Sequence, residues 1–233
     1  MLEVSGLNAH YGRAHILHDV DFNVASGQVV ALLGRNGAGK STTMKAVVGL
    51  VRPTSGMVTF DGVPVAGKPP HAIVKLGLAY VPEERRIFTD LTVAENLEVG
   101  RRPPREGAPT WTPERLFGLF PNLGEMRDRP GGRMSGGEQQ MLTIARSLMG
   151  NPTFVLLDEP SEGLAPIIVE QMANTIRELK SKGLTVLISE QNLHFARLVA
   201  DRAIIIEKGE IRYTGTMDEL AADDEIRAAY LTV

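Results

Sequence analysis

The sequence predicts an α/β fold built on a mostly parallel sheet that is buried on both faces. Short apolar runs rich in β-branched residues alternate with segments of helical periodicity near residue 30 and again after residue 151. Between them, residues 88–150 are predominantly helical in pattern, and one glycine-rich segment joins an early strand to a helix. Repeated strand–helix units place parallel strands side by side, with helices covering the sheet.

The composition is that of a globular protein whose 233 residues can bury a sizeable core, with 43% hydrophobic and 23% charged residues. The net charge of −3 offers no basic surface, so we expect no nucleic-acid partner. The absence of cysteine excludes disulfides and thiolate metal sites. The first residues lack a signal-peptide pattern, and no apolar run reaches the roughly 20 residues of a membrane span. We therefore expect a cytoplasmic chain that meets a membrane only through a partner.

Residues 1–30 are expected to form a hairpin-like β region. Residues 2–4 and 20–24 alternate apolar and polar side chains, and a turn follows at Ser26 and Gly27. Tyr11 lies between the two strands. Its chemistry alone favours a partly buried aromatic at a strand edge, and the alternative is a face on which adenine stacks.

Residues 34–41 fit the pattern G-x-x-x-x-G-K-[ST] of a phosphate-binding loop, between a strand at 28–33 and a helix from Ser41. Its glycines remove the Cβ atoms that keep a backbone away from phosphate, and the free N–H groups of the helix start favour an anion. Lys40 supplies charge for the β- and γ-phosphates, and the Ser41 hydroxyl can reach Mg²⁺. The flanks disfavour the alternative, an ordinary glycine-rich turn. We predict an ATP-type site with these nucleotide-binding residues: Gly34, Arg35, Asn36, Gly37, Ala38, Gly39, Lys40, Ser41 and Thr42.

The segments after this loop alternate strands, turns and helices. Thr92 is expected to begin a helix as the first residue of a capping box with Glu95. We expect strands at 57–60, 78–81, 153–157, 185–188, 202–206 and 210–213, and helices at 72–76, 92–97, 113–120, 135–149, 167–180, 192–200 and 217–230.

Two carboxylates, Asp158 and Glu159, follow the buried strand at 153–157. A carboxylate in that position is costly unless it is paired or faces a ligand. In the functional interpretation, Asp158 binds the Mg²⁺ that Ser41 also holds, and Glu159 polarises the attacking water. The alternative, two exposed acids at a strand end, is disfavoured by the phosphate loop upstream.

Ser135, Gly136 and Gly137 indicate a second anion site. Read alone, they fit a plain loop before a capped helix, but a serine hydroxyl and glycine amides at a helix N-terminus also suit a phosphate. Two such helix starts in one chain predict that each ATP is held from two sides, by two copies.

In these motifs the chain resembles the nucleotide-binding subunit of ABC transporters, over essentially its full length. The phosphate loop, the signature at 134–140, the strand and acids at 154–159 and the loop at 160–164 match that family in order and spacing. The resemblance implies that the active form is a head-to-tail dimer closed by two ATP molecules. It also implies that the serine and glycines at 135–137 bind the γ-phosphate held by the opposite subunit, and that Tyr11 stacks on adenine.

The resemblance implies the fold of a P-loop NTPase ABC cassette, in which residues 1–233 form a single ABC ATPase domain. Its core would be a RecA-like, mostly parallel sheet. An antiparallel β subdomain is expected at about 1–30 and 56–62, and a helical subdomain at about 88–150.

Two positions depart from the family's common pattern. The family's Gln, which contacts Mg²⁺ and the transporter, is Glu83 here, an acceptable oxygen ligand for Mg²⁺. The family's His at the γ-phosphate is Gln191 here, which can donate a hydrogen bond but cannot take a charge. The resemblance therefore implies Glu159 and Gln191 as catalytic residues. The metal ligands it implies are Ser41, Glu83 and Asp158.

At both of these positions the chain resembles the shorter ATPase subunit of high-affinity branched-chain amino acid importers, the LivF type. The same resemblance is seen in segments 82–88, 161–166 and 190–192. This implies a dimer with an identical or different ABC ATPase subunit, integral membrane permeases, a periplasmic binding protein and a place on the cytoplasmic face of the inner membrane. The equivalent subunit of a urea or amide importer is an alternative. A soluble, non-transport ABC ATPase is disfavoured because the chain lacks a coiled coil, a second cassette or a basic arm. A regulator without turnover is disfavoured by the two acids at 158 and 159.

Overall fold

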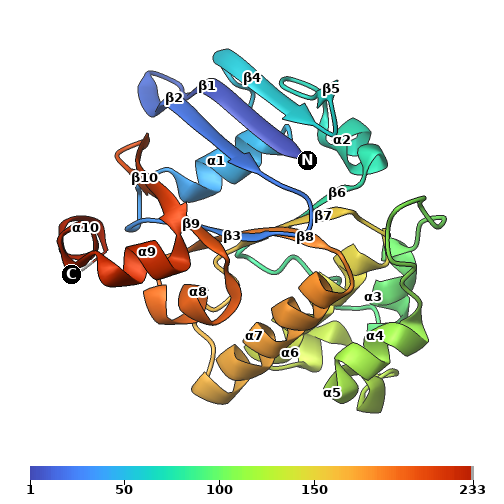
Figure 1. Cartoon of the computed structure of the whole chain (residues 1–233). Helices are drawn as coiled ribbons and strands as arrows, with labels where there is room; N and C mark the ends of the chain where they lie inside the picture. The colour runs from blue at the N-terminus through green and yellow to red at the C-terminus, as the bar shows by residue number, and fades with distance from the viewer. Residues whose placement is uncertain (232–233) are drawn as a thin grey trace.

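The central sheet of the computed structural model, which describes residues 1–231, has six strands in the order β10-β9-β3-β8-β7-β6 (Figure 1). Five of them run parallel, and β10 pairs antiparallel with β9. This confirms the mostly parallel sheet. The strands are β3 (Val29–Leu33), β6 (Leu78–Val81), β7 (Phe154–Asp158), β8 (Thr185–Glu190), β9 (Arg202–Glu207) and β10 (Glu210–Thr216).

A second, antiparallel sheet has the order β2-β1-β4-β5. Its strands are β1 (Leu2–Tyr11), β2 (Ala14–Val24), β4 (Ser55–Phe60) and β5 (Val63–Pro64). The hairpin of β1 and β2 is longer than expected. Irregular pairing between residues 4 and 10 interrupts the alternation of apolar and polar residues there. The full length of the strands could therefore not be predicted from that alternation.

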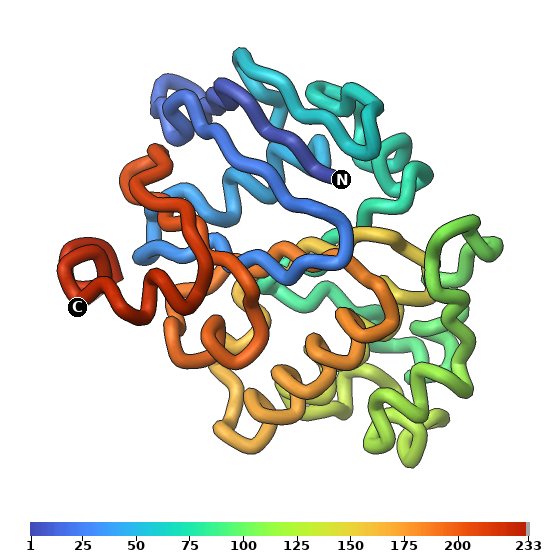
Figure 2. The backbone as a smooth tube through the Cα atoms, viewed as in Figure 1, coloured from blue at the N-terminus to red at the C-terminus, as the bar shows by residue number. Residues whose placement is uncertain are grey.

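Helix α1 (Lys40–Val47) lies between the two sheets, and most other helices lie on the far side of the central sheet (Figures 1 and 2). None of the helices within residues 1–231 is long and apolar enough to cross a membrane. The other helices are α2 (Pro70–Leu76), α3 (Val93–Gly100), α4 (Pro113–Leu119), α5 (Pro121–Glu125), α6 (Gly136–Leu148), α7 (Pro166–Ser181), α8 (Leu193–Val199), α9 (Met217–Ala222) and α10 (Asp224–Tyr230), with a 3₁₀ turn at Gly131–Arg133.

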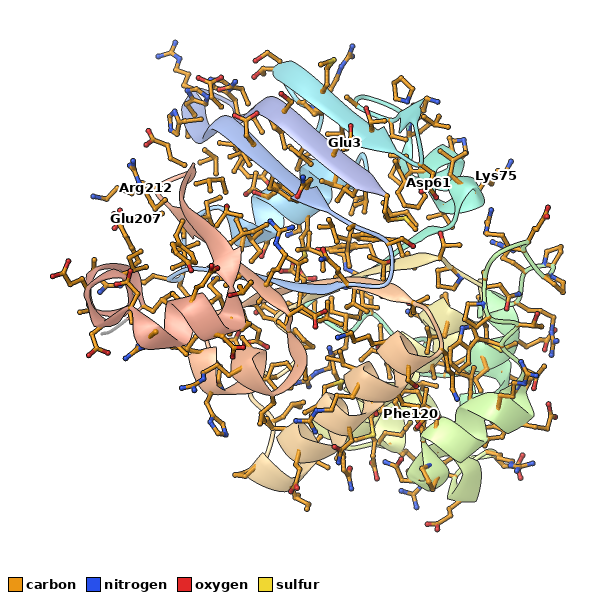
Figure 3. The ribbon with its side chains drawn as sticks, viewed as in Figure 1. Glu3, Asp61, Lys75, Phe120, Glu207 and Arg212 are labelled. Atoms are coloured by element: carbon orange, nitrogen blue, oxygen red, sulfur yellow. The ribbon has the colours of Figure 1, made fainter. Side chains whose placement is uncertain are left out.

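Strand β3 divides the interior into two hydrophobic cores. Val29, Ala31 and Leu33 pack into the core beneath the sheet, with α6, α7 and α8, whereas Val30 and Leu32 pack towards α1 and the antiparallel sheet. Figure 3 shows the side chains that fill both layers, with Phe120 among the lower helices. Burial on both faces explains why this strand is apolar throughout rather than alternating.

Several expected boundaries were wrong; strand β10, for example, continues to Thr216 rather than ending at residue 213. Strand β8 does not end at residue 188 but continues through Ser189 and Glu190, which are buried although they are polar. The expected terminal helix at 217–230 is two helices, because the Asp223 carboxylate accepts a hydrogen bond from the backbone N–H of Ile226 and caps a new helix. The capping box of Thr92 and Glu95 is confirmed.

The turn at Gly209 ties the antiparallel sheet to the phosphate loop. Its carbonyl accepts a hydrogen bond from the backbone N–H of His18 at 2.8 Å, and its N–H donates to the carbonyl of Ala38 at 2.8 Å. Gly209 has a φ of +80°, and a Cβ there would lie 1.9 Å from the backbone oxygen of Ile16. Both the left-handed backbone and the close approach therefore require glycine.

Replacing Gly209 by Ala should lower the free energy of unfolding by about 2–4 kcal/mol, because strain and a backbone clash add. Gly67→Ala is the matched control, since Gly67 has a φ of +74° with nothing within 4 Å of its Cβ position, and it should cost about 1 kcal/mol. Urea unfolding of both variants checks this. Equal losses would show that the contact with Ile16 does not matter.

Candidate functional site

The predicted site residues converge at the carboxyl-terminal edge of the central sheet. The phosphate loop follows β3, Asp158 ends β7, and β8 lies between these two strands. Parallel strands end at the same edge of a sheet, which is where ligands bind in open α/β folds. The hydroxyl of Ser41 accordingly lies 3.0 Å from Oδ1 of Asp158.

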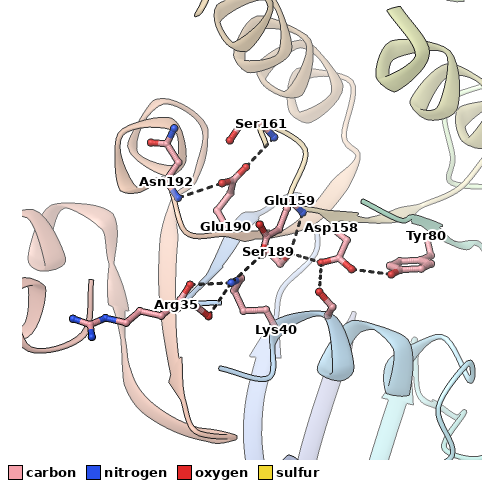
Figure 4. Close-up of polar contacts among 11 residues, drawn as sticks. Arg35, Lys40, Tyr80, Asp158, Glu159, Ser161, Ser189, Glu190 and Asn192 are labelled. Atoms are coloured by element: carbon pink, nitrogen blue, oxygen red, sulfur yellow. Dashed lines mark hydrogen bonds and ion pairs between the residues drawn. The ribbon is translucent and has the colours of Figure 1, made fainter. Parts of the chain in front are cut away.

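The ammonium group of Lys40 is buried and fully paired (Figure 4). Its Nζ donates to the backbone oxygens of Gly34, at 2.9 Å, and Arg35, at 3.2 Å. It also forms an ion pair with Oε1 of Glu159 at 3.0 Å. Because a buried charge needs compensation, an anion that enters beside Lys40 takes over the role that this carboxylate has here.

The glycines of the phosphate loop have different tasks. Gly39, with a φ of +113°, precedes α1 in a left-handed conformation that glycine adopts without strain. We expected Gly34 to let the backbone approach a phosphate, but the structure shows a different need for glycine. A Cβ on Gly34 would lie 2.4 Å from the backbone oxygen of Ile206 in β9. The start of the loop is therefore held against the protein's own sheet.

The carboxylate of Asp158 is 1% exposed and receives three hydroxyl hydrogen bonds (Figure 4). Ser41 and Ser189 donate to Oδ1, at 3.0 and 2.5 Å, and the phenol of Tyr80 donates to Oδ2 at 2.8 Å. The alternative of an exposed acid at a strand end is thereby excluded for Asp158. Burial first, and then the charge of Asp158, raises the pKa of Tyr80, so this phenol keeps its proton and acts as a donor.

These oxygens suit Mg²⁺, which prefers carboxylate, hydroxyl and phosphate oxygens to a cage made only of protein. No group of three or more acidic or histidine side chains within residues 1–231 is arranged to hold a metal ion. Ser41 and Asp158 fit a metal that arrives with phosphate oxygens. Partial burial, and then the charges of Glu159 and Asp158, raises the pKa of Glu83 at the edge of the same cavity. A cation there would relieve this crowding of carboxylates.

Glu159 is buried and has a φ of +46°, a left-handed backbone that is strained for a residue other than glycine. Its Oε2 is buried without a partner among the described residues. Burial opposes its ionisation, but hydrogen bonds with Glu162 and Lys40 and the charge of Lys40 outweigh that effect, and the pKa of Glu159 is lowered. The hydrogen bond with Glu159, and then burial, raises the pKa of Glu162 to about 7. Of the two acids, Glu159 therefore ionises more readily than Glu162.

A cavity of about 410 Å³ opens over these groups. Tyr11, at the end of β1, is 49% exposed and lines it. The cavity is lined by Tyr11, Ile16, Asn36, Gly37, Gly39, Lys40, Ser41, Thr42, Glu83, Glu159 and Glu162. Most predicted site residues are thus brought together.

The other predicted residues do not line this cavity. Gly34 and Ala38 are buried in the loop, and Asp158 lies behind Ser41. Gln191 is exposed, directly after the end of β8. The backbone oxygen of Arg35 accepts a hydrogen bond from Lys40.

Ser135, Gly136 and Gly137 also lie outside the cavity. Ser135 caps α6 in a capping box: its hydroxyl accepts from the N–H of Glu138, and the Glu138 carboxylate accepts from the N–H of Ser135 at 2.7 Å. The serine is exposed. The prediction that these residues reach a phosphate therefore requires a phosphate on another molecule.

Glu190 is a site residue that the sequence did not indicate. Its carboxylate accepts from the backbone N–H groups of Ser161, at 3.1 Å, and Asn192, at 3.3 Å, while its carbonyl accepts from the N–H of Gly34 at 3.3 Å. It joins the phosphate loop to the segments after β7 and β8. Burial raises the pKa of Glu190 to about 7, although these hydrogen bonds lower it.

Tyr80, Ser189 and Glu162 were missed as well. The register of β7 and β8 pairs Asp158 with Ser189, so a correct strand order would have placed that hydroxyl beside the carboxylate. Tyr80 lies in β6, directly beside β7. The only signal in the sequence was a polar group in an otherwise apolar strand.

The chain matches the family model described as ABC transporter over residues 17–162. It is 42% identical over 231 residues to the high-affinity branched-chain amino acid transport ATP-binding protein BraG of Pseudomonas aeruginosa, covering 99% of each chain. It is 38% identical over 233 residues to the lipopolysaccharide export system ATP-binding protein LptB of Haemophilus influenzae, covering 99% of this chain and 97% of that protein. A crystal structure of a nucleotide-free ATP-binding cassette from an ABC transporter matches with a TM-score of 0.83 at 28% identity, covering 97% and 96% of the two chains.

Replacing Glu190 by Gln should make stability less sensitive to pH. A carboxyl whose pKa is raised from 4.5 to about 7 on folding favours the folded state below pH 4.5, and that contribution is lost as the pH rises to about 7. The free energy of unfolding of Glu190→Gln, measured relative to wild type, should therefore be higher at pH 8 than at pH 5 by on the order of 1–3 kcal/mol. Urea unfolding at both pH values measures this difference. A difference that does not change with pH would show that the carboxyl is ionised throughout.

Proposed function

The chain belongs to the ABC transporter family as its ATP-binding, ATP-hydrolysing subunit, and from that premise we propose that it drives the import of branched-chain amino acids. The observation that supports this solute most is the 42% identity to BraG over 99% of both chains. The segments around residues 82–88 and 161–166 support the same subgroup.

In this proposal, ATP binds at the N-terminus of α1 with its phosphates on the loop at 34–41. The ammonium of Lys40 exchanges the carboxylate of Glu159 for phosphate oxygens, which leaves Glu159 free to accept a proton from the attacking water. Ser41, Asp158 and Glu83 would hold Mg²⁺, and the ion would offset charge on the β- and γ-phosphates. Tyr11 stacks on adenine at the exposed end of β1, and Gln191 donates a hydrogen bond to the γ-phosphate.

The proposed active form is a dimer with an identical or different ATPase subunit. Ser135 is exposed, Gly136 and Gly137 are half-buried, and all three lie outside this chain's own cavity. This supports a role towards ATP on the partner subunit. Closure of the dimer would move two integral membrane permeases at the cytoplasmic face of the inner membrane, with a periplasmic binding protein delivering the solute.

A second candidate solute is lipopolysaccharide, because the chain is also 38% identical to LptB over nearly all of both chains. Deleting the reading frame in the source organism separates the two. Import predicts that high-affinity uptake of radiolabelled leucine falls to background and returns with the wild-type gene, while lipopolysaccharide at the cell surface is unchanged. Unchanged leucine uptake together with a loss of surface lipopolysaccharide would contradict the proposal and favour export.

Glu159→Gln should slow ATP hydrolysis by about 10²- to 10⁴-fold, because an amide cannot accept the proton of the attacking water. ATP binding should persist, since the amide leaves Lys40 without a competing charge. Phosphate release and equilibrium binding of labelled ATP measure the two effects, and Glu170→Gln, on the exposed face of α7, is the control. Undiminished turnover would remove Glu159 from the mechanism.

A further inference from the structure

Both oxygens of the Asp158 carboxylate accept hydrogen bonds, and the donors to the two oxygens differ. Oδ1 accepts from Ser41 and Ser189. Oδ2 has one hydrogen-bond partner within residues 1–231, the phenol of Tyr80 at 2.8 Å. A carboxylate that is 1% exposed depends on such donors for its charge.

The two donors on Oδ1 have further tasks. Ser41 is itself a proposed metal ligand, and a hydroxyl oxygen that binds a metal turns its lone pair, not its proton, towards the site. The hydroxyl of Ser189 also accepts a hydrogen bond from the backbone N–H of Glu159 at 3.0 Å, so its position follows the backbone there. The bond from Tyr80 is made to Oδ2, the oxygen that faces away from Ser41 and Ser189.

Tyr80 is well placed to fix the plane of this carboxylate. Strand β6 pairs with β7 in register, with Tyr80 opposite Leu156 and Val81 opposite Leu157. The phenol therefore reaches Asp158 from a neighbouring strand rather than from a mobile loop. Figure 4 shows the phenol of Tyr80 and the side chain of Ser189 beside the Asp158 carboxylate.

We infer that Tyr80 is a positioning residue for the metal site: its hydrogen bond to Oδ2 holds Asp158 so that Oδ1 faces Ser41 and the metal. Without the phenol, the carboxylate can rotate, and both of its oxygens compete for the same cation. This inference rests on the proposed binding of MgATP. It assigns to Tyr80 an effect on metal affinity that acts through Asp158, because Tyr80 does not line the nucleotide cavity.

The test is Tyr80→Phe in the full chain, with Mn²⁺ as the probe. Loss of a hydrogen bond to a metal-ligating carboxylate typically costs 10- to 100-fold in metal affinity. Electron paramagnetic resonance of Mn²⁺ in the presence of ATP should show about a tenfold weaker metal affinity. Binding of ATP in excess EDTA should stay within about twofold of wild type, because Lys40 and the loop are untouched. Tyr213→Phe, on β10 outside the cavity, should change neither quantity.

Equal Mn²⁺ affinity in Tyr80→Phe and wild type would overturn the inference. It would also be overturned if Tyr80→Phe lost ATP affinity to the same extent with metal and in EDTA, because that loss would indicate a general structural role. These results differ from failure of the proposed function, in which wild type itself binds no nucleotide and the inference falls with it.

A spectroscopic measurement covers the case in which Tyr80→Phe does not fold. The chain has four tyrosines, so 3-fluorotyrosine labelling gives four ¹⁹F signals, and phenylalanine replacements at 11, 213 and 230 assign Tyr80 by elimination. Adding Mg²⁺ to the ATP-bound wild-type chain should shift the Tyr80 signal and leave those of Tyr213 and Tyr230 in place. An unmoved Tyr80 signal would contradict the inference.

Discussion

The structure of this site depends on a buried positive charge. Lys40 begins α1 with its ammonium 3% exposed, and three acceptors surround it: two backbone oxygens of the phosphate loop and the carboxylate of Glu159. The backbone oxygens set the curvature of the loop around the lysine. The carboxylate makes the charge tolerable in the interior, and it is the acceptor that a phosphate can replace. In the proposed function this exchange would couple binding to catalysis, since the anion that takes Lys40 would release the residue proposed to activate water.

The same exchange applies to the neighbouring negative charge. The Asp158 carboxylate is held by the hydroxyl groups of Ser41, Ser189 and Tyr80. A metal that takes one of these hydroxyls as a ligand meets a carboxylate that is already oriented, which lowers the cost of ordering the site. The parallel sheet makes both arrangements possible, because β3, β8 and β7 end at one edge. The strained backbone of Glu159 lies at that edge too, and the hydrogen bond from its N–H to Ser189 helps to hold it.

The sequence predicted what depends on local pattern. The phosphate loop has a fixed spacing, and the acids at 158 and 159 follow an apolar strand, so both could be read without tertiary information. Tyr80 could not, because its role depends on β6 lying beside β7, a neighbour far away in the chain. Ser189 and Glu190 were left outside the predicted strand, since polar residues in a strand buried on both faces contradict the usual pattern. The positive φ of Glu159 follows from its surroundings rather than from its residue type, and the break at Asp223 was hidden by the helix-favouring residues around it. The exposed start of α6 was predicted as an anion site, and its proposed phosphate lies outside any single chain.

The most direct test of the account is a structure of the chain with Mg²⁺ and a non-hydrolysable ATP analogue. It should show Nζ of Lys40 on the β- and γ-phosphate oxygens, with the Glu159 carboxylate released from it and facing the γ-phosphate. An intact ion pair between Lys40 and Glu159 beside bound nucleotide would contradict the exchange on which binding and catalysis are here proposed to depend.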